Sequence, residues 1–206
     1  MAVTVITGDI GAGKSSAAKI TADILGCERL DADITARSLW ERSDIKAQAV
    51  RRWGSDILDV SGNIIRAEIA RRIFSAKSDY DFCNALLHPL VMLELEEHSR
   101  EIGAAVIEIP LLPEVGRPVW ADTVIYVAAS FDVRAERCRS RGWDAEELRR
   151  RENFLLPQSR RIDISDYIIF NEGSISDLER QTGEIINEYK RSSGEKEHTR
   201  QRQMES

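Results

Sequence analysis

The sequence predicts a three-layer α/β/α fold in which helices cover both faces of a parallel five-stranded sheet. The strand-like segments are continuous apolar runs, which is typical of strands buried on both faces, and segments with helical spacing separate them. In addition, the first apolar run leads through a glycine-rich turn directly into a helix. The 206 residues are enough for one domain that carries a large insertion.

The first predicted strand is residues 2–7 (AVTVIT), which are apolar and largely β-branched. A helix follows over residues 14–25, and Gly26 stands directly after it, where glycine commonly ends a helix. The remaining strands are predicted at residues 28–30, 104–109, 123–129 and 167–170.

Residues 36–102 contain no convincing strand and predict a helical insertion. Apolar residues recur there at helical spacing, as at Ile65 and Ile69. Proline disrupts a helix interior, so the step from His88 to Pro89 predicts a break between two helices. The core is therefore expected at residues 1–35 and 103–190, around this insertion.

The last predicted helix begins near Ser176, which forms a capping-box pattern with Glu179. Apolar residues nearly vanish from Arg191 onward. A chain without apolar residues has nothing to pack against the core. We therefore expect residues 191–206 to form a flexible tail.

The composition excludes several classes of protein. There are 29 Lys and Arg residues against 35 Asp and Glu, a net charge of −6, which argues against a general nucleic-acid binder. No apolar run is long enough to span a membrane, and no secretion signal is visible, so we expect a cytoplasmic protein. Cys27, Cys83 and Cys138 are widely spaced and predict reduced thiols rather than a zinc site.

The segment GDIGAGKS, from Gly8 to Ser15, matches the phosphate-loop pattern G-x-x-x-x-G-K-[ST] between a strand and a helix. Its glycines let successive backbone N–H groups turn toward phosphate oxygens, and the helix start adds a positive dipole end. Lys14 is then expected to reach the terminal phosphates, and the Ser15 hydroxyl to bind Mg²⁺. The sequence thus predicts ATP and Mg²⁺ as ligands.

Asp31 and Asp33 follow the second strand, in LDADITAR. In extended geometry, residues two apart point the same way, toward the crevice at the strand ends. A carboxylate there can orient an acceptor hydroxyl, accept its proton or bind Mg²⁺ through water. The alternative is an ordinary helix N-cap, a position that Asp favours.

Residues 134–161 contain nine arginines, no lysine and five acidic residues, which is a local charge of +4. Arg134, Arg137 and Arg141 fall on one helical face. Arginine suits phosphate oxygens, so we expect a short helical lid that mutual repulsion holds open and phosphate ligands draw closed. The alternative is a solvated surface network of ion pairs.

Seven segments occur along the chain in a fixed order: GDIGAGKSS, LDADITAR, GNIIRAEIARRIF, LLHPLV, IPLLPEVG, RAERCRSRG and SDYIIFNEGS. The ordered motifs DAD-x-x-A-R, H-P-L-V, P-L-L-x-E and D-Y-x-I-x-N after a phosphate loop resemble the dephospho-coenzyme A kinase family. The resemblance covers about residues 3–190.

This resemblance implies a P-loop kinase that uses ATP and Mg²⁺ to phosphorylate the ribose 3′-hydroxyl of dephospho-coenzyme A. It places Asp33 near the acceptor hydroxyl as a base or orienting group, and it assigns substrate binding to Asp31 and Asp33 and, in the insertion, to Arg66 and His88. It assigns further residues by region: ATP phosphates to Gly11, Ala12, Gly13, Lys14, Ser15 and Ser16, the lid to Arg137 and Arg141, and the adenine or lid hinge to Asn171.

The chain departs from the family pattern at four positions. The family usually has Gly in place of Asp9 and Ser in place of Ala12. An acid in a phosphate-binding loop is unfavourable unless its side chain points outward. Pro113 replaces a bulky apolar residue, and Leu155 stands where the family commonly has Gln.

Two other functions fit the same residues. One is a different small-molecule or nucleoside monophosphate kinase, because a fold does not determine its substrate. The other is a nucleotide-binding regulator without turnover. In each case we expect a small-molecule ligand, no nucleic acid or membrane partner, and a monomer or weak homo-oligomer.

Overall fold

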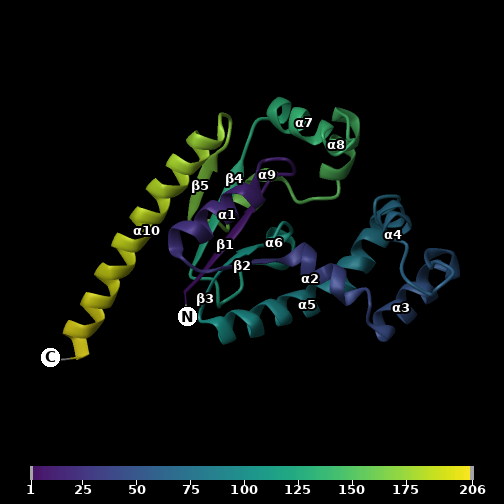
Figure 1. The fold of residues 1–206 in the computed structure, drawn as a ribbon, viewed down its shortest axis with the longest axis horizontal. Helices are drawn as coiled ribbons and strands as arrows, with labels where there is room; N and C mark the ends of the chain where they lie inside the picture. The colour runs from purple at the N-terminus through teal and green to yellow at the C-terminus, as the bar shows by residue number, and fades with distance from the viewer. Residues whose placement is uncertain (1, 205–206) are drawn as a thin grey trace.

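The structure, a computed structural model, describes the backbone of residues 2–204 and the side chains up to Ser192. Its centre is a parallel five-stranded sheet with strand order β2-β3-β1-β4-β5, which confirms the predicted fold class (Figure 1). The strands are β1 Ala2–Gly8, β2 Glu28–Asp31, β3 Ala104–Glu108, β4 Thr123–Ala128 and β5 Tyr167–Phe170.

The strand order places a crevice between the ends of β1 and β3. In the strand order, the connection from β1 leads to β2 at one edge of the sheet. The connection from β3 runs in the opposite direction, past β1 to β4. Ligands of open parallel sheets bind at such a switch point, outside the carboxyl ends of the strands. The register aligns Asp31 with Glu108 and Glu108 with Ile6, so the ends of three strands meet there.

Both faces of the sheet are buried, as the continuous apolar strands predict. On β1, Val5 belongs to the core shared with the insertion, and the next residue, Ile6, belongs to the core under α1 (Lys14–Leu25) and α10 (Ile175–Met204). Gly26 ends α1 in the left-handed conformation, as predicted.

The insertion extends to the side of the sheet opposite α10 (Figure 1). Apart from an isolated bridge between Leu58 and Ile64, its described residues are helical or irregular. It contains the end of α2 Ala32–Leu39, then α3 Ser43–Trp53, the 3₁₀ turn η1 Ser55–Ile57, α4 Arg66–Ile73 and α5 Lys77–Ile102.

The predicted helix break at His88–Pro89 is wrong, because α5 runs uninterrupted through Pro89. A proline inside a helix costs about 3 kcal/mol. Apolar residues at four-residue intervals on both sides of it are buried in the core, and each large one contributes about 1.5–3 kcal/mol. Their burial outweighs the local cost; they are Cys83, Leu87, Val91 and Leu95.

The remaining helices follow β3 and β4. They are α6 Leu112–Val115, α7 Phe131–Arg139, α8 Ala145–Glu152 and α9 Gln158–Ile162, and the last three form the region predicted as a lid. Among the described residues, no helix is long and apolar enough to cross a membrane.

Helix α10 begins two residues before the predicted start. Ser174 Oγ accepts from the Asp177 N–H at 3.3 Å, and Asp177 Oδ2 accepts from the Ser174 N–H at 3.0 Å. This reciprocal cap replaces the predicted pair of Ser176 and Glu179, because the same spacing occurs twice in the sequence. The helix continues to Met204, through most of the predicted tail, and residues 205–206 lie outside the described part.

Candidate active site

The phosphate loop lies between the end of β1 and the start of α1. Gly11 and Gly13 have φ of +77° and +97°, which a residue with a side chain rarely adopts. A Cβ on Gly13 would lie 2.4 Å from Asn171 Nδ2, so glycine is also required for space. Gly13 precedes α1 without a side-chain cap, which leaves the first N–H groups of this helix for a ligand.

Residues from the lid and from the end of β5 bond the carbonyl oxygens of this loop. Asn171 Nδ2 donates to the Ala12 carbonyl at 2.7 Å, and Arg137 Nη1 donates to the Asn171 carbonyl at 2.9 Å. Arg134 Nη1 donates to the Ile10 carbonyl at 3.2 Å. Asn171 therefore connects the phosphate loop to the lid residue Arg137.

Lys14 rests on its own loop. Its Nζ donates to the carbonyls of Gly8, at 3.2 Å, and Asp9, at 2.9 Å. Burial lowers the pKa of Lys14, and the negative charges of Glu108 and Asp33 oppose this shift. The ammonium group thus lies among carboxylates at the crevice.

Glu108 is a site residue that we did not predict from the sequence. Ser15 Oγ donates to Glu108 Oε1 at 3.0 Å, and Glu108 Oε2 is buried without a hydrogen-bond partner, 4.0 Å from Arg29 Nη1. Burial raises the pKa of this carboxyl. Its position in the sequence could have identified it, because Glu108 is the acid that ends the apolar strand AAVIE, next to the strand that leads into the phosphate loop.

Asp31 and Asp33 do not share one extended geometry, so that expectation is wrong. Strand β2 ends at Asp31, and Asp33 lies in the first turn of α2. The Asp31 carboxylate accepts from the N–H groups of Asp33, at 2.8 Å, and Ile34, at 3.3 Å. Asp31 is therefore an N-cap that fixes the start of the helix on which Asp33 stands.

Asp33 lies between the phosphate loop and a cavity. The surrounding protein displaces water and raises the pKa of its carboxyl, and Asp31 adds to this shift. The positive charges of Lys14, Arg37 and Arg141 lower that pKa in turn, so all three are close enough to Asp33 to act on its carboxyl. Asp33 also lines the cavity itself.

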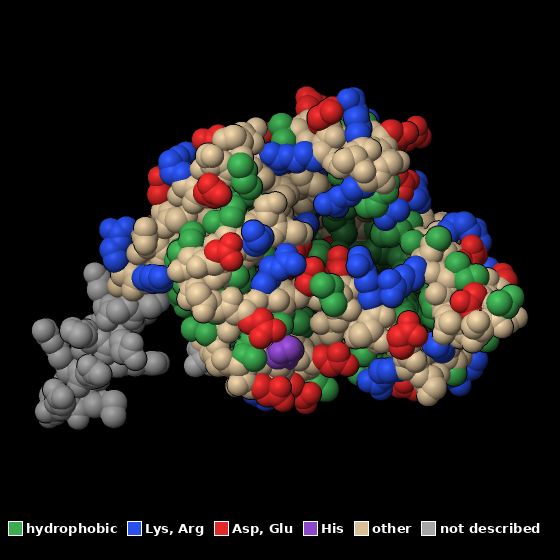
Figure 2. Space-filling view, in the orientation of Figure 1, with side chains coloured by type: hydrophobic (Ala, Val, Ile, Leu, Met, Phe, Trp, Pro, Cys, Tyr) green, Lys and Arg blue, Asp and Glu red, His purple; other side chains and the backbone are tan. Residues whose placement is uncertain are grey.

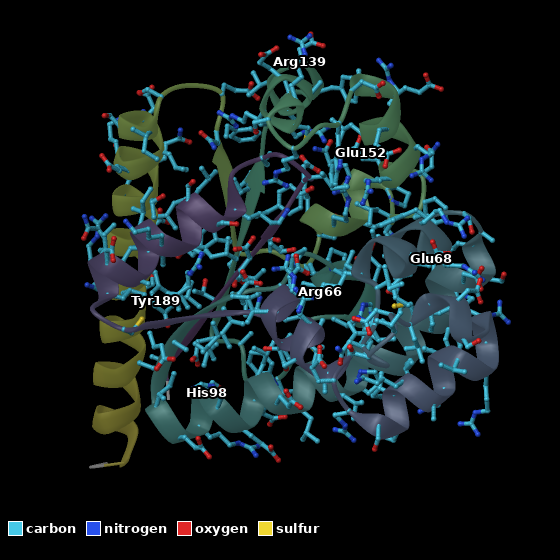
Figure 3. All side chains as sticks on the ribbon, turned by 45° about the vertical axis from the view of Figure 1, so that its right-hand side comes forward. Arg66, Glu68, His98, Arg139, Glu152 and Tyr189 are labelled. Atoms are coloured by element: carbon cyan, nitrogen blue, oxygen red, sulfur yellow. The ribbon has the colours of Figure 1, made fainter. Side chains whose placement is uncertain are left out.

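The cavity has a volume of about 360 Å³ and lies between the sheet and the insertion. Figure 2 shows this hollow, with hydrophobic side chains inside and Lys and Arg at its rim. Arg66 and His88, the residues expected to hold the coenzyme, line this cavity, and Arg66 lies near α2 (Figure 3). Burial lowers the pKa of His88, so its ring is neutral near pH 7.

Most lid arginines are paired, so the expectation of a flap held open by repulsion is wrong. Arg151 pairs with Glu147 at 2.7 Å and also stacks on the rings of Phe74 and Trp143. The backbone N–H of Arg141 donates to the Cys138 carbonyl at 2.9 Å, but its side chain forms no hydrogen bond or ion pair with a described residue. The other ion pairs are Arg134–Glu152, Arg139–Glu136, Arg150–Glu147 and Arg161–Asp9.

Comparison with known proteins agrees with this geometry. The family model for dephospho-CoA kinase matches residues 2–177. A dephospho-CoA kinase from Methylococcus capsulatus is 34% identical over 195 residues, covering 92% of this chain and 97% of that protein. The solved structure of TT1252 from Thermus thermophilus is 32% identical with a TM-score of 0.71, covering 91% of this chain and 97% of that one.

A solved dephospho-CoA kinase from Campylobacter jejuni shares the fold, with a TM-score of 0.62 and 20% identity over 93% of this chain and 98% of that one. The family model and the relative from Methylococcus capsulatus each cover most of the sequence. The chain therefore belongs to the dephospho-CoA kinase family.

Proposed function

We propose that this kinase transfers the γ-phosphoryl group of ATP to the ribose 3′-hydroxyl of dephospho-coenzyme A, giving coenzyme A and ADP. One observation carries the proposal. Asp33 lines an apolar cavity and at the same time interacts electrostatically with Lys14 of the phosphate loop. A hydroxyl held at Asp33 would therefore face the phosphate that is transferred.

The phosphate loop supplies the ATP site. Its residues from Gly11 to Ser16 would surround the phosphates with N–H groups at the start of α1. Lys14 would exchange its bonds to the Gly8 and Asp9 carbonyls for the phosphate oxygens. Its charge would then stabilise the negative charge on the transferred group.

The residues present fit a Mg²⁺ ion at Ser15 and Glu108. Among the described residues, no three His, Cys, Asp or Glu side chains form a ready metal cluster. A magnesium ion in a kinase commonly takes one or two protein oxygens together with phosphates and water. The Ser15 hydroxyl and Glu108 Oε2, which has no hydrogen-bond partner and lies 4.0 Å from Arg29 Nη1, are such oxygens. When bound, Mg²⁺ neutralises charge on the phosphates.

Asp33 would orient the acceptor hydroxyl and accept its proton. The raised pKa of this carboxyl brings it closer to the operating pH, which favours a general base. Asp31 would act through Asp33, because its own carboxylate is occupied by the cap.

Arg66 and His88 would bind the acceptor in the cavity. The Arg66 guanidinium suits the diphosphate of dephospho-coenzyme A, and the neutral His88 ring suits a hydrogen bond rather than an ion pair. The apolar lining would accept the uncharged parts of that molecule.

Arg137 and Arg141 would have different tasks. Arg137 is held by the Asn171 carbonyl and supports the phosphate loop from behind. Arg141 interacts electrostatically with both Lys14 and Asp33, so it is placed to contact the phosphoryl group in transfer.

We also infer a cytoplasmic enzyme that acts on a soluble small molecule as a monomer or weak homo-oligomer. The net charge of −6 supports the absence of a nucleic-acid partner. Size-exclusion chromatography with light scattering would test the oligomeric state, and a stable trimer or larger assembly would contradict it.

The deciding experiment measures ADP release with ATP and Mg²⁺ against a panel of acceptors: dephospho-coenzyme A, adenosine, nucleoside monophosphates and shikimate. We expect turnover with dephospho-coenzyme A and at least about tenfold lower kcat/KM with the others. Turnover of another acceptor alone would indicate a different kinase. ATP binding without acceptor-dependent ADP release would indicate a regulator.

A further inference from the structure

Asp9, inside the phosphate loop, has a wholly buried side chain with three partners. Tyr126 Oη donates to its Oδ1 at 2.6 Å, and Gln158 Nε2 donates to its Oδ2 at 2.9 Å. Arg161 Nη1 forms an ion pair with Oδ1 at 2.8 Å, and Arg161 is 7% exposed. The acid therefore points into the protein, and its charge is balanced there.

Two of these partners belong to one segment, residues 154–161, which we call the strap. Besides holding Asp9 through Gln158 and Arg161, the strap reaches the cavity at its other end. The Phe154 ring lies 5.3 Å from that of Tyr80 and 5.7 Å from that of Phe74, and both of these residues line the cavity.

A second contact fixes the strap between these two ends. Leu156 N–H donates to Glu114 Oε1, on α6, at 3.1 Å. The strap thus joins the wall of the acceptor cavity to the phosphate loop over eight residues. It contacts the loop through the side chain of Asp9.

The backbone of Asp9 bonds the lysine of the loop. Its carbonyl accepts from Lys14 Nζ at 2.9 Å and from the Ala12 N–H at 3.2 Å, while its own N–H donates to the Val127 carbonyl. A change in the position of Asp9 therefore changes the position of Lys14 and of the loop. The side-chain carboxylate of Asp9 holds the same residue in place through Tyr126, Gln158 and Arg161.

We propose that Asp9 is a positioning residue for the nucleotide: its buried carboxylate fastens the strap to the phosphate loop and so holds the loop ready for ATP. The inference rests on the proposed function only in that the bound nucleotide is ATP. Loss of either partner of the Asp9–Arg161 pair weakens the connection between strap and loop and leaves one buried charge unbalanced.

Three variants separate positioning from stability: Asp9→Asn, Arg161→Met and the double variant. Each single change leaves a buried charge without its partner, so we expect Tm to fall by about 5–10 °C. The double variant has no unbalanced charge, and we expect it to recover at least half of that loss. The ion pair between the strap and the phosphate loop is absent in all three, and only the hydrogen bond of Gln158 to residue 9 can still connect them.

The chain offers a matched control in Asp166, at the opposite end of the sheet. Its carboxylate also has an arginine, a hydroxyl and an N–H as partners: Arg117 at 2.8 Å, Thr123 at 3.2 Å and Val124 at 2.8 Å. Asp166→Asn therefore removes a similar set of contacts without touching the loop or the strap.

The measurements are the Kd of a non-hydrolysable ATP analogue by calorimetry, and amide hydrogen exchange of the strap. We expect at least about tenfold weaker binding and faster exchange of residues 154–161 in all three variants, with both unchanged in Asp166→Asn. If the double variant regains the wild-type Kd along with its Tm, or if Asp9→Asn binds as the wild type does, Asp9 is a structural residue only and the proposal is wrong. Neither measurement needs the acceptor, so a failure of the proposed phosphorylation in the ADP assay is a separate result.

Discussion

The hydroxyl of Ser15 donates to Glu108 Oε1 at 3.0 Å, and this bond joins the first turn of α1 to the end of β3. It spans the switch point of the sheet, where the β1 and β3 ends meet. The second carboxylate oxygen of Glu108 is left buried without a hydrogen-bond partner. This arrangement motivates the assignment of Mg²⁺ to these two residues.

The first prediction concerns Mg²⁺ dependence. Glu108→Gln keeps the shape and the bond from Ser15 but removes the negative charge. The Mg²⁺ concentration for half-maximal rate should rise about 10- to 100-fold. A magnesium titration of the ADP-release rate measures this, with the exposed Glu97→Gln as the control. An unchanged titration in Glu108→Gln would remove Glu108 from the metal site.

The same variant predicts a change of stability with pH. Burial raises the pKa of Glu108, so the folded protein binds this proton more tightly than the unfolded chain does. The free energy of unfolding therefore falls as pH rises from the ordinary value of 4.5 through the raised folded pKa. Glu108→Gln cannot ionise and escapes this loss.

Thermal unfolding at a series of pH values measures the effect. Glu108→Gln should have a higher Tm than the wild type at pH 7, and the difference should shrink as pH falls toward 4. A lower Tm for the variant at pH 7 would mean that the ionised carboxylate stabilises the native crevice. We therefore expect Glu108→Gln to be more stable at pH 7 but less active, because the buried charge that binds Mg²⁺ destabilises the folded protein.

A third prediction concerns the shape of the phosphate loop. Gly13→Ala combines an unfavourable φ with a Cβ placed 2.4 Å from Asn171 Nδ2. We expect a loss of about 1–3 kcal/mol in the free energy of unfolding and at least about tenfold weaker ATP binding. Denaturant unfolding and calorimetry with ATP measure the two effects.

The control for this change is Gly183→Ala, within α10. A Cβ there meets nothing within 4 Å, and alanine favours a helix by about 1 kcal/mol over glycine. This variant should be as stable as the wild type or more so, with unchanged ATP binding. If Gly13→Ala also binds ATP normally, the loop does not depend on the contact with Asn171.

Arg141 provides the fourth prediction, because its charge lowers the pKa of both Lys14 and Asp33 and its side chain forms no ion pair among the described residues. Arg141→Ala should lower kcat/KM at least about tenfold and change stability by less than about 0.5 kcal/mol. Arg139→Ala is the control on the same lid, because Arg139 points away from the site and pairs with Glu136 (Figure 3). Equal kinetics of the two variants would make Arg141 a surface residue.

Sequence alone predicted the sheet and much of the site, because both depend on local patterns. Continuous apolar runs mark four of the five strands, and the spacing from Gly8 to Ser15 marks the loop; β2, with the sequence ERLD, has no such run. Once the loop is located, the position of Asp33 after the second strand brings it to the same edge of the sheet.

The features that sequence did not predict depend on contacts between distant segments. Glu108 becomes a site residue only because β3 pairs with β1, and Pro89 stays within a helix because of tertiary packing around α5. The charge of Asp9 is balanced by Arg161, which is 152 positions later in the numbering. No local pattern contains these pairings.

In the proposed reaction, Asp33 presents the acceptor hydroxyl to the nucleotide bound at Lys14. Steady-state kinetics of Asp33→Asn with ATP and dephospho-coenzyme A test it most directly, because the change keeps the shape and removes the base. We predict that kcat falls at least about 10²-fold while KM for ATP changes less than about twofold. A near-normal kcat, or a loss that appears only in KM for ATP, would contradict the account.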